Sequence, residues 1–518
     1  MRNRLPRLPL GVPILLLTVL GALLRFYAIG RQGFWYDESY TALLVGRGPG
    51  EMLRLLPQLE STPPLYYCVA WVWVRIFGAH EAGLRSLSAL CGTLTIPVAY
   101  LAARKLLASW RAALIVAALT ACNPFLVWYA QEARAYAMLV LLSACTLLAF
   151  AYARERPRTP AVALWALACA LALLTHYYAA IIVAPEAAWM LYEHRHSRAV
   201  QLGIGAIVLV SLALTPLAVR QSGNRSNHWI EHSSYLLRLR QVPAVFLLGP
   251  QIHARELLKF AGFAMVAVAV LLLVGRARRR ERQGALLPGA LALAGFLLSA
   301  ITGHSTLLAR NLLPIWPAAA IFLAGGLGAA RARVTGTAAA AVLCAIGIVG
   351  VVSVDTTEAF QRPDWRLLAS ALGRWPAQAQ GDTRGDGRIV LIQDNPSLLP
   401  LELYLKDLRY IRTPAVHRIV AIDVVAALPQ KGLGGFCWWG SECNLVPSRL
   451  DRSYAIPGFR IVARRRVRDF GILELRASRP MTVPVSSLPV PPGYEQHRQR
   501  VRAGSQAVAD ARLVEQGR

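Results

Sequence analysis

The feature that most constrains this chain is a series of apolar stretches, most of them close to membrane-spanning length, separated by short arginine clusters. A helix needs about 20 mostly apolar residues to cross the hydrocarbon core of a bilayer. Of the 518 residues, 55% are hydrophobic and 16% are charged, which excludes an ordinary soluble globule. A net charge of +28 suggests nucleic-acid binding in a soluble protein, but here the arginines lie between apolar runs and indicate topology. We therefore predict a polytopic α-helical membrane protein without a nucleic-acid partner.

The arginine clusters predict how the helices alternate across the membrane. Three arginines precede the first apolar stretch, Leu8 to Ile29, so the positive-inside rule places the N-terminus in the cytoplasm and the loop from Gly30 outside. The stretch Pro64 to Phe77 is short and rich in aromatic residues. It has the composition of either a span or an interfacial helix, and we prefer the interface because the later arginine clusters then fall on the cytoplasmic side.

About eleven crossings follow from this assignment. After the first, the predicted spans are Ser86 to Ala103, Ala112 to Tyr129, Tyr136 to Tyr152, Ala161 to His176, Tyr177 to Tyr192, Leu202 to Val219, Phe260 to Val274, Leu286 to Ile301, Leu312 to Gly328 and Gly336 to Val352. The basic loop from Arg220 to Lys259 falls outside, against the charge rule, which long loops obey weakly.

Beyond Val352 the sequence is mixed in character and predicts a small extracytoplasmic α/β domain. We divide the chain into a membrane domain at 1–352, with a first extracytoplasmic loop and juxtamembrane helices at 30–85, an α/β domain at 353–478 and a loosely ordered tail at 479–518. The predicted strands are Arg388 to Gln393, Arg418 to Val425 and a pair within Phe459 to Leu475, with a helix at Leu399 to Lys406. Cys437 and Cys443 predict a short-loop disulfide in this domain, with two free thiols as the alternative.

Polar residues that could take part in catalysis or binding gather on the predicted outer side of the membrane. The pair Asp37-Glu38 follows the first helix and lies among aromatic residues. Ionisable groups at membrane depth are costly, so they are functional candidates, although an interfacial acid bonded to backbone amides is the alternative. The same side collects the Tyr66-Tyr67 pair, Arg85, the run 128–136, His176 with Tyr177, and Arg310.

These motifs together resemble the bacterial branch of the dolichyl-phosphate-mannose protein mannosyltransferase superfamily, which includes the lipid A aminoarabinose transferases. The resemblance rests on the Asp37-Glu38 pair, Thr-Pro-Pro-Leu-Tyr-Tyr at 62–67, Gly-Leu-Arg-Ser at 83–86, the run 123–136 and Thr-His-Tyr-Tyr at 175–178. It continues more weakly through 308–314 and through Arg-Pro-Asp-Trp-Arg at 362–366. Many relatives have Arg-Tyr where this chain has Arg310-Asn311. The resemblance implies a GT-C fold, a lipid-monophosphate sugar donor and an inverting transfer.

The resemblance also implies roles for individual residues. Asp37 is the expected general base, which takes the proton of the acceptor hydroxyl. Glu38 orients the acceptor or Asp37, or else makes a purely structural hydrogen bond. Arg85, Arg134 and Arg310 are expected to stabilise the departing lipid phosphate. The alternative for each arginine is a helix-end residue paired with a neighbouring acid, such as Glu81 or Glu132.

Further residues on this side are candidates for substrate binding. His176 lies between two short apolar segments, where a broken helix would present it to a cavity, although a packing histidine is the alternative. Packing in an interfacial belt also explains most of the aromatic residues. The candidate substrate-binding residues are Tyr36, Tyr66, Tyr67, Gln131, Glu132, Tyr136, His176 and Tyr177. No metal-ligand spacing stands out, and we expect no metal or other cofactor.

The expected function is that of a plasma-membrane glycosyltransferase of the cell envelope. It would move mannose or another hexose or pentose from a polyprenyl-phosphate donor to a glycan, lipid or protein acceptor, as in lipopolysaccharide modification or protein glycosylation. The main alternative is a transporter or flippase of a lipid-linked or small solute, which the lack of an internal repeat disfavours. A third is an inactive assembly subunit, against which the intact Asp37-Glu38 pair and Arg134 argue.

Overall fold

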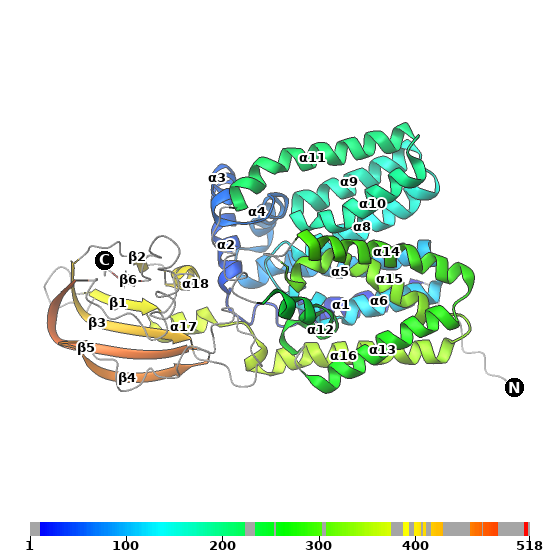
Figure 1. Cartoon of the computed structure of the whole chain (residues 1–518). Coiled ribbons are helices and arrows are strands. Elements are labelled where there is room, and N and C mark those ends of the chain that lie inside the picture. Colours follow the sequence, from blue (N-terminus) through cyan, green and yellow to red (C-terminus); the bar gives the residue numbers. More distant parts are fainter. Residues whose placement is uncertain are drawn as a thin grey trace. The chain divides into compact units, whose positions relative to one another are not determined.

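The computed structural model divides the chain into two compact units (Figure 1). Unit 1 comprises residues 1–30 and 44–360, and unit 2 comprises residues 31–43 and 361–518. A short segment directly after the first helix thus belongs with the C-terminal part of the chain. The structure describes residues 11–222, 234–252, 255–302, 307–373, 387–392, 398–405, 408–410, 416–427, 456–468, 470–484 and 512–515.

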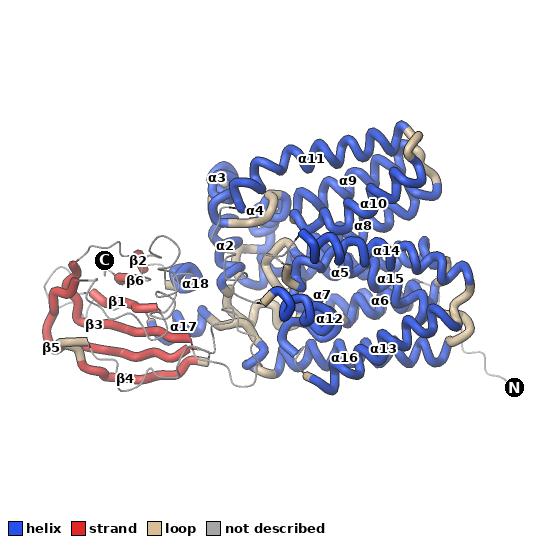
Figure 2. The backbone as a smooth tube through the Cα atoms, viewed as in Figure 1, coloured by secondary structure: helices blue, strands red, loops and turns tan. Residues whose placement is uncertain are grey.

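The described part of unit 1 is helical (Figure 2), and six of its helices are long and apolar enough to cross a membrane. They are α5 (Glu81–Leu107), α8 (Tyr136–Glu155), α11 (Arg198–Ser222), α13 (Glu256–Gly275), α14 (Arg279–Thr302) and α16 (Arg333–Thr356). A seventh candidate is the pair α6 (Trp110–Cys122) and α7 (Pro124–Ala130), which is bent by 56°. The prediction of a polytopic helical membrane protein is confirmed.

All eleven predicted spans are helical in the structure, but four of them are short. Helices α1 (Gly11–Phe26), α9 (Thr159–Thr175), α10 (Ala180–His194) and α15 (Trp316–Leu327) have between 12 and 17 residues as described. Two of these follow 3-10 turns, η1 (Tyr177–Ala179) before α10 and η3 (Ala309–Ile315) before α15. The length criterion therefore counts six or seven spans where the sequence predicts eleven.

Several helices lie between the predicted spans. The first outer loop contains α2 (Tyr36–Val45), α3 (Pro49–Leu59) and α4 (Leu65–Phe77). With 13 residues, α4 is about 20 Å long, well short of the membrane core, which suits an interfacial helix. The predicted loop from Arg220 to Lys259 contains α12 (Tyr235–Ile252), which kinks at Gly249, a residue with a φ of 78°. The 3-10 turn η4 (Glu358–Phe360) follows α16.

The helices of unit 1 differ in how far they are buried. In the apolar window of α8, 67% of residues are buried inside the protein, compared with 11% in α11. Glycines allow close helix contacts in the interior, because a Cβ at Gly326 would overlap the Ala269 carbonyl of α13 and one at Gly295 would overlap the Ile181 carbonyl of α10. Helix α11 instead exposes large apolar side chains such as Leu202 and Leu209, as a lipid-facing helix does.

Unit 2 is built on a mixed sheet with the strand order β2-β6-β1-β3-β5-β4. Only β1 and β3 pair in parallel, and the other neighbours are antiparallel. The strands are β1 (Gly387–Ile392), β2 (Leu408–Tyr410), β3 (Val416–Ala427), β4 (Arg460–Val467), β5 (Phe470–Pro484) and β6 (Arg512–Glu515). The predicted strands and the predicted helix, α18 (Leu398–Tyr404), are therefore present.

The sheet of unit 2 has an apolar core on each face. Helix α17 (Trp365–Leu372) and α18 cover one face, where Trp365 packs on Phe470 with ring centroids 4.7 Å apart. The other face buries Ile422, Val424 and Leu473 among other aliphatic residues. Alternate residues of β3 and β5 thus point to opposite cores, as expected for strands buried on both faces.

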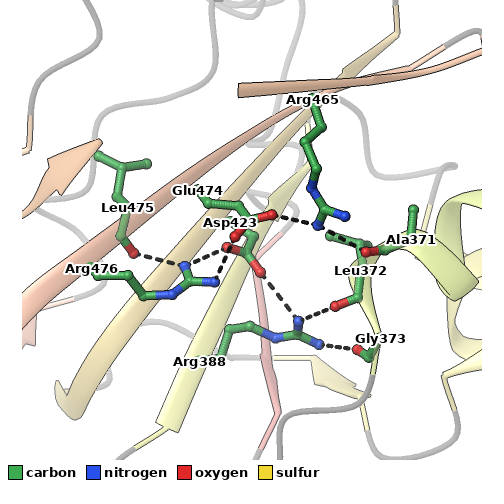
Figure 3. A network of polar contacts seen from close by, with 9 residues as sticks. All are labelled: Ala371, Leu372, Gly373, Arg388, Asp423, Arg465, Glu474, Leu475 and Arg476. Carbon is green, nitrogen blue, oxygen red and sulfur yellow. Dashed lines mark hydrogen bonds and ion pairs between the residues drawn. The ribbon is translucent and has the colours of Figure 1, made fainter. Parts of the chain in front are cut away.

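A network of charged side chains joins the centre of this sheet to α17 (Figure 3). Asp423 is 2% exposed and pairs with Arg388 at 3.2 Å and with Arg476 at 2.7 Å. Arg388 also donates to the carbonyls of Leu372 and Gly373, both at 2.8 Å, at the C-terminal end of α17. Because a cation at a helix C-terminus satisfies carbonyls that lack helical partners, Arg388 fixes this end of α17 to the sheet.

Candidate active site

The run 128–136 lies where the broken helix α6/α7 turns into α8. Asn123 makes the break, because its Oδ1 accepts from Leu126 N at 2.9 Å and caps α7, while its Nδ2 donates to Phe246 O at 2.8 Å. Trp128, Tyr129 and Glu132 are buried. The polar end of the run therefore follows a helix break fixed by a side-chain cap.

Near this break, a side chain of α1 caps the C-terminal end of α6, and a side chain that follows α7 caps the C-terminal end of α1. Arg25 of α1 donates to the carbonyls of Thr120 and Ala121 at 2.8 and 3.0 Å, at the C-terminal end of α6. Gln131 donates to the carbonyls of Leu24 and Tyr27 at 3.2 and 3.1 Å, at the C-terminal end of α1. The amide of Gln131, a candidate substrate-binding residue, thus joins the run to α1.

Arg134 forms an ion pair with Glu60, in which the side chains are 12% and 3% exposed. Glu60 is the C-cap residue of α3 and precedes the Ser-Thr-Pro-Pro-Leu-Tyr-Tyr stretch. The sequence offered Glu81 and Glu132 as acidic neighbours of the candidate arginines. The acid found on Arg134 is instead one that lies 74 positions away in the chain.

Tyr66 and Tyr67 pack around this ion pair and are fully buried. The Tyr67 hydroxyl lies 3.0 Å from Thr62 Oγ1 and also interacts with the Glu60 carboxylate. The Tyr66 hydroxyl is 3.5 Å from Ser88 Oγ, which in turn donates to the carbonyl of Arg134 at 3.2 Å. The two tyrosines thus connect α4 and α5 to the residues on either side of the ion pair.

Gln221, near the end of α11, extends this polar network. Its Nε2 donates to Thr62 O at 3.0 Å, and its Oε1 accepts from the Tyr177 hydroxyl at 2.7 Å. The Gln221 side chain is 2% exposed. Tyr177 is therefore joined to the Thr62 loop through a residue that the sequence analysis did not select.

His176 occupies the break between α9 and η1, as the sequence predicts for a discontinuous helix. Its Nδ1 accepts from Tyr178 N at 3.2 Å, and its ring centroid lies 5.4 Å from that of Tyr136. The guanidinium of Arg310, on η3, lies 5.9 Å from the Tyr136 ring. Arg134 lies two residues before Tyr136 in the same run. One aromatic residue, one histidine and two arginines are thus brought together from three separate parts of the chain.

Arg85 and Glu132 also lie in unit 1. Arg85 is the fifth residue of α5, is 2% exposed and donates to Ile29 O at 2.9 Å. Glu132 is 1% exposed, and its carbonyl accepts from Arg134 N at 2.8 Å, which closes the turn between α7 and α8. The Arg85 side chain is therefore bonded to the chain segment that follows α1.

The acidic pair and Tyr36 belong to unit 2. Asp37 and Glu38 stand in the first turn of α2, where carboxylates are favoured by the helix dipole. Glu38 Oε2 accepts from Trp35 N at 3.3 Å, as the acid of a capping box does, so the structural hydrogen bond considered for Glu38 is present. The hydroxyls of Tyr36 and Tyr40 are 3.1 Å apart.

Some sequence predictions cannot be placed. Cys437 and Cys443, the predicted disulfide, lie outside the residues that the structure describes. Within the described ranges, no group of three or more His, Cys, Asp or Glu side chains is arranged to hold a metal ion.

The polar and aromatic residues joined in this way form the unit 1 cluster: Glu60, Tyr66, Tyr67, Arg134, Tyr136, His176, Tyr177, Gln221 and Arg310. Two of them, Glu60 and Gln221, were not predicted from the sequence. A signal existed for Glu60, since it is an acid directly before the motif 62–67. Gln221 carried no such signal, because it ends an apolar helix and begins a stretch that reads as a basic loop.

Part of the chain that holds this cluster matches a known protein family. Residues 61–219 match the family model described as dolichyl-phosphate-mannose-protein mannosyltransferase, a range that holds all of the unit 1 cluster except Glu60, Arg310 and Gln221. No curated protein sequence matches the chain.

Solved structures show the same fold over most of the chain. A crystal structure of ArnT from Cupriavidus metallidurans in the apo state matches with a TM-score of 0.54 at 15% identity, and the same enzyme bound to undecaprenyl phosphate matches with 0.53 at 16%. Each match covers 89% of this chain and 97% of the ArnT chain.

Fold and family match together define the class of protein as a multi-pass membrane glycosyltransferase with an ArnT-like fold. The resemblance drawn from the sequence is confirmed. The family match itself is confined to residues 61–219, and the likeness of the rest of the chain is one of fold.

Proposed function

We propose that the protein transfers a sugar, mannose or another hexose or pentose, from a polyprenyl-phosphate donor to an extracytoplasmic glycan, lipid or protein, with inversion at the anomeric carbon. The observation that carries this proposal is the cluster of Arg134, Glu60, His176 and Arg310, in which Arg134 and His176 lie within the family-matched region. The complex of ArnT with undecaprenyl phosphate supports a polyprenyl phosphate as the carrier.

The chemistry requires one base and cationic stabilisation of a leaving group. Asp37 takes the proton of the acceptor hydroxyl as the hydroxyl oxygen attacks the anomeric carbon. The bond between that carbon and the phosphate oxygen breaks, and the lipid phosphate leaves with the bonding electrons. Negative charge grows on the phosphate in the transition state, where guanidinium groups stabilise it. We assign this role to Arg134 and Arg310, with Arg85 as a third donor.

The neighbours of Arg134 suit a residue that must be held in one orientation. Glu60 fixes its guanidinium, while the network from Tyr67 through Thr62 to Gln221 fixes the loop that carries Glu60. Because guanidinium presents five N–H donors, one carboxylate partner leaves an arginine able to bind phosphate as well. We propose that Tyr66 and Tyr67 order the arginine, and that Tyr136, His176 and Tyr177 contact the substrate.

We further propose that the N-terminus is cytoplasmic and that the site and unit 2 face the extracytoplasmic side. Basic residues at the ends of α5 and α8 and at the start of α16 support this orientation through the positive-inside rule. Labelling of single cysteines from either side of sealed vesicles tests it. Labelling of position 109 from outside, rather than from inside, would reverse the assignment.

The function is tested with purified protein, radiolabelled polyprenyl-phosphate sugars and a membrane extract as acceptor. The wild type should transfer label from at least one hexose or pentose donor, and Asp37→Asn should lose transfer while still binding donor. Glu155→Gln, an exposed acid at the end of α8, serves as the matched control and should leave transfer unchanged. Equal transfer by wild type and Asp37→Asn would remove Asp37 from the mechanism. Solute uptake into proteoliposomes without donor consumption would favour a transporter.

A further inference from the structure

We propose that Asp364 is a positioning residue for the reaction, because it fixes the segment that carries Asp37 and Glu38. The C-terminal domain then sets the geometry of the general base, in addition to any contact with the acceptor. The inference rests on the proposed function in one respect, that Asp37 is the base. It begins from the composition of unit 2, which joins residues 31–43 to residues 361–518.

Asp364 contacts both the acidic segment and the helix that follows it. Its Oδ1 accepts from Gly33 N at 3.3 Å and, as the N-cap of α17, from Leu367 N at 3.1 Å. Its Oδ2 lies 3.6 Å from Arg468 Nη1, so a cation balances the carboxylate. The Asp364 side chain therefore binds the loop before Asp37, caps the N-terminus of α17 and pairs with Arg468, the residue that follows β4.

The residues next to Asp364 hold the same segment by further hydrogen bonds. Arg366 Nη2 donates to Arg31 O at 2.6 Å, and Arg362 N donates to Gln32 Oε1 at 3.2 Å. Phe34 N donates to the Tyr404 hydroxyl at 2.6 Å. Each residue from 31 to 34 is thus bonded to the C-terminal part of unit 2.

The approach at Gly33 is too close for any side chain. A Cβ there would lie 2.9 Å from Arg366 Cβ and 3.0 Å from the Asp364 carboxylate. The weak sequence motif at 362–366 therefore has a physical role, because it forms the surface on which the segment 31–34 lies.

The helix behind Asp364 is itself anchored at both ends. Trp365 is 1% exposed and packs on Phe470, and Arg388 binds the last carbonyls of α17 while pairing with Asp423 (Figure 3). Helix α17 therefore holds Asp364 in a fixed position relative to the sheet, and the Asp364 carboxylate in turn holds Gly33.

The position of Gly33 matters because α2 begins only three residues later. Trp35 N is bonded to Glu38, so the chain from Phe34 to the first turn of α2 has little room to move independently. Misplacement of a reacting group by about 1 Å costs on the order of 100-fold in rate. Loss of the Gly33 contact should therefore lower turnover without weakening donor binding, which we assign to arginines of unit 1.

The experiment compares Asp364→Ala with Asp364→Asn in the full-length protein. Asparagine retains an oxygen for Gly33 N and Leu367 N, whereas alanine retains none. In Asp364→Ala we expect amide hydrogen exchange of the peptide covering 31–35 to rise at least about tenfold, kcat to fall about 10- to 100-fold and the donor KM to stay within about twofold. In Asp364→Asn, the exchange at 31–35 and kcat should both stay close to their wild-type values. Gly33→Ala should reproduce the Asp364→Ala pattern without changing any charge.

A matched control separates positioning from loss of stability. Ile422→Val trims the core on the face of the sheet away from α17, so it lowers the stability of unit 2 without altering the Asp364 contacts and should leave exchange at 31–35 near that of the wild type. Unchanged exchange at 31–35 in Asp364→Ala would overturn the proposal, as would faster exchange with unchanged kcat. If Asp37→Asn retains transfer, the base assignment fails instead, and the exchange data still decide whether Asp364 holds the segment.

Discussion

The two units each bury an arginine and a carboxylate, but in different surroundings. In unit 2, Asp423 lies inside a regular sheet, where strand register places it opposite Glu474 and between Arg388 and Arg476. In unit 1, Arg134 lies in a turn and Glu60 ends a helix, and the surroundings are aromatic rings and a histidine. Scaffold elements commonly carry stability, while the loops that they position carry function. The comparison favours a structural role for the Asp423 network, and it agrees with our proposal that the Arg134 pair serves the reaction.

The largest expected effect comes from breaking the sheet network. Asp423→Ala removes a carboxylate from two arginines in a site that is 2% exposed, so we expect unit 2 to lose about 3–5 kcal/mol of stability. Hydrogen exchange of β3 and the denaturant midpoint of unit 2 measure this loss. Arg464→Ala, an exposed arginine of β4, is the control and should change stability by less than about 0.5 kcal/mol. Equal losses in both variants would contradict a structural role for the network.

The unit 1 pair is tested by removing both charges together. Arg134→Gln combined with Glu60→Gln leaves no unpaired buried charge, so stability should change by only about 1 kcal/mol. Transfer should nevertheless fall about 10²- to 10³-fold, because a donor to the developing phosphate charge is lost. Initial rates and melting temperature are measured on the same preparation. Transfer at the wild-type rate would place the pair with Asp423 as a structural feature.

Gln221 allows a smaller test at the edge of the unit 1 cluster. Gln221→Leu removes the bonds to Thr62 O and the Tyr177 hydroxyl, which should cost about 1–3 kcal/mol and lower transfer less than the double variant does. The same substitution at Gln201, an exposed residue on the same helix, is the control. Identical melting temperatures and rates for the two variants would show that the Gln221 bonds contribute nothing.

The smallest effect is expected at a surface pair of unit 1. Lys105 and Glu155 lie 2.5 Å apart with side chains that are 22% and 55% exposed. Lys105→Ala should change stability by about 0–1 kcal/mol and leave transfer unaltered, as is usual for exposed pairs. A loss comparable with that of Asp423→Ala would mean that burial does not separate the two kinds of ion pair.

Apolar length and strand alternation were sufficient to predict most elements of this fold. Each predicted span is helical, and the strands beginning near Arg388 and Arg418 are present, because burial in lipid or in a sheet core leaves a direct pattern in the sequence. Juxtamembrane helices were expected within 30–85 without bounds for α2 and α3, whereas α12 was read as part of a basic loop, because its arginines and prolines interrupt the apolar pattern. Six or seven of the predicted spans meet the length criterion among the described residues, because 3-10 turns and breaks shorten several of the apolar runs.

The candidate site was less accessible to sequence reasoning. Motifs pointed to Arg134 and His176, and the structure places both in one cluster with Arg310. The partner of Arg134 could not be deduced, because Glu60 reaches it through tertiary folding rather than through helix periodicity. The same applies to Asp364 and Gly33, which lie 331 positions apart.

That separation has a consequence for biosynthesis. Chains emerge from the ribosome N-terminus first, so the segment with Asp37 is made long before its partner Asp364 and before the sheet that supports α17. Nascent chains therefore insert their helices while the acidic segment still lacks the surface on which it will lie. We expect a chain that stops after α16 to insert into the membrane yet to remain inactive. Under the proposed function, the segment with Asp37 would thus reach its final position only after the C-terminal domain has been made.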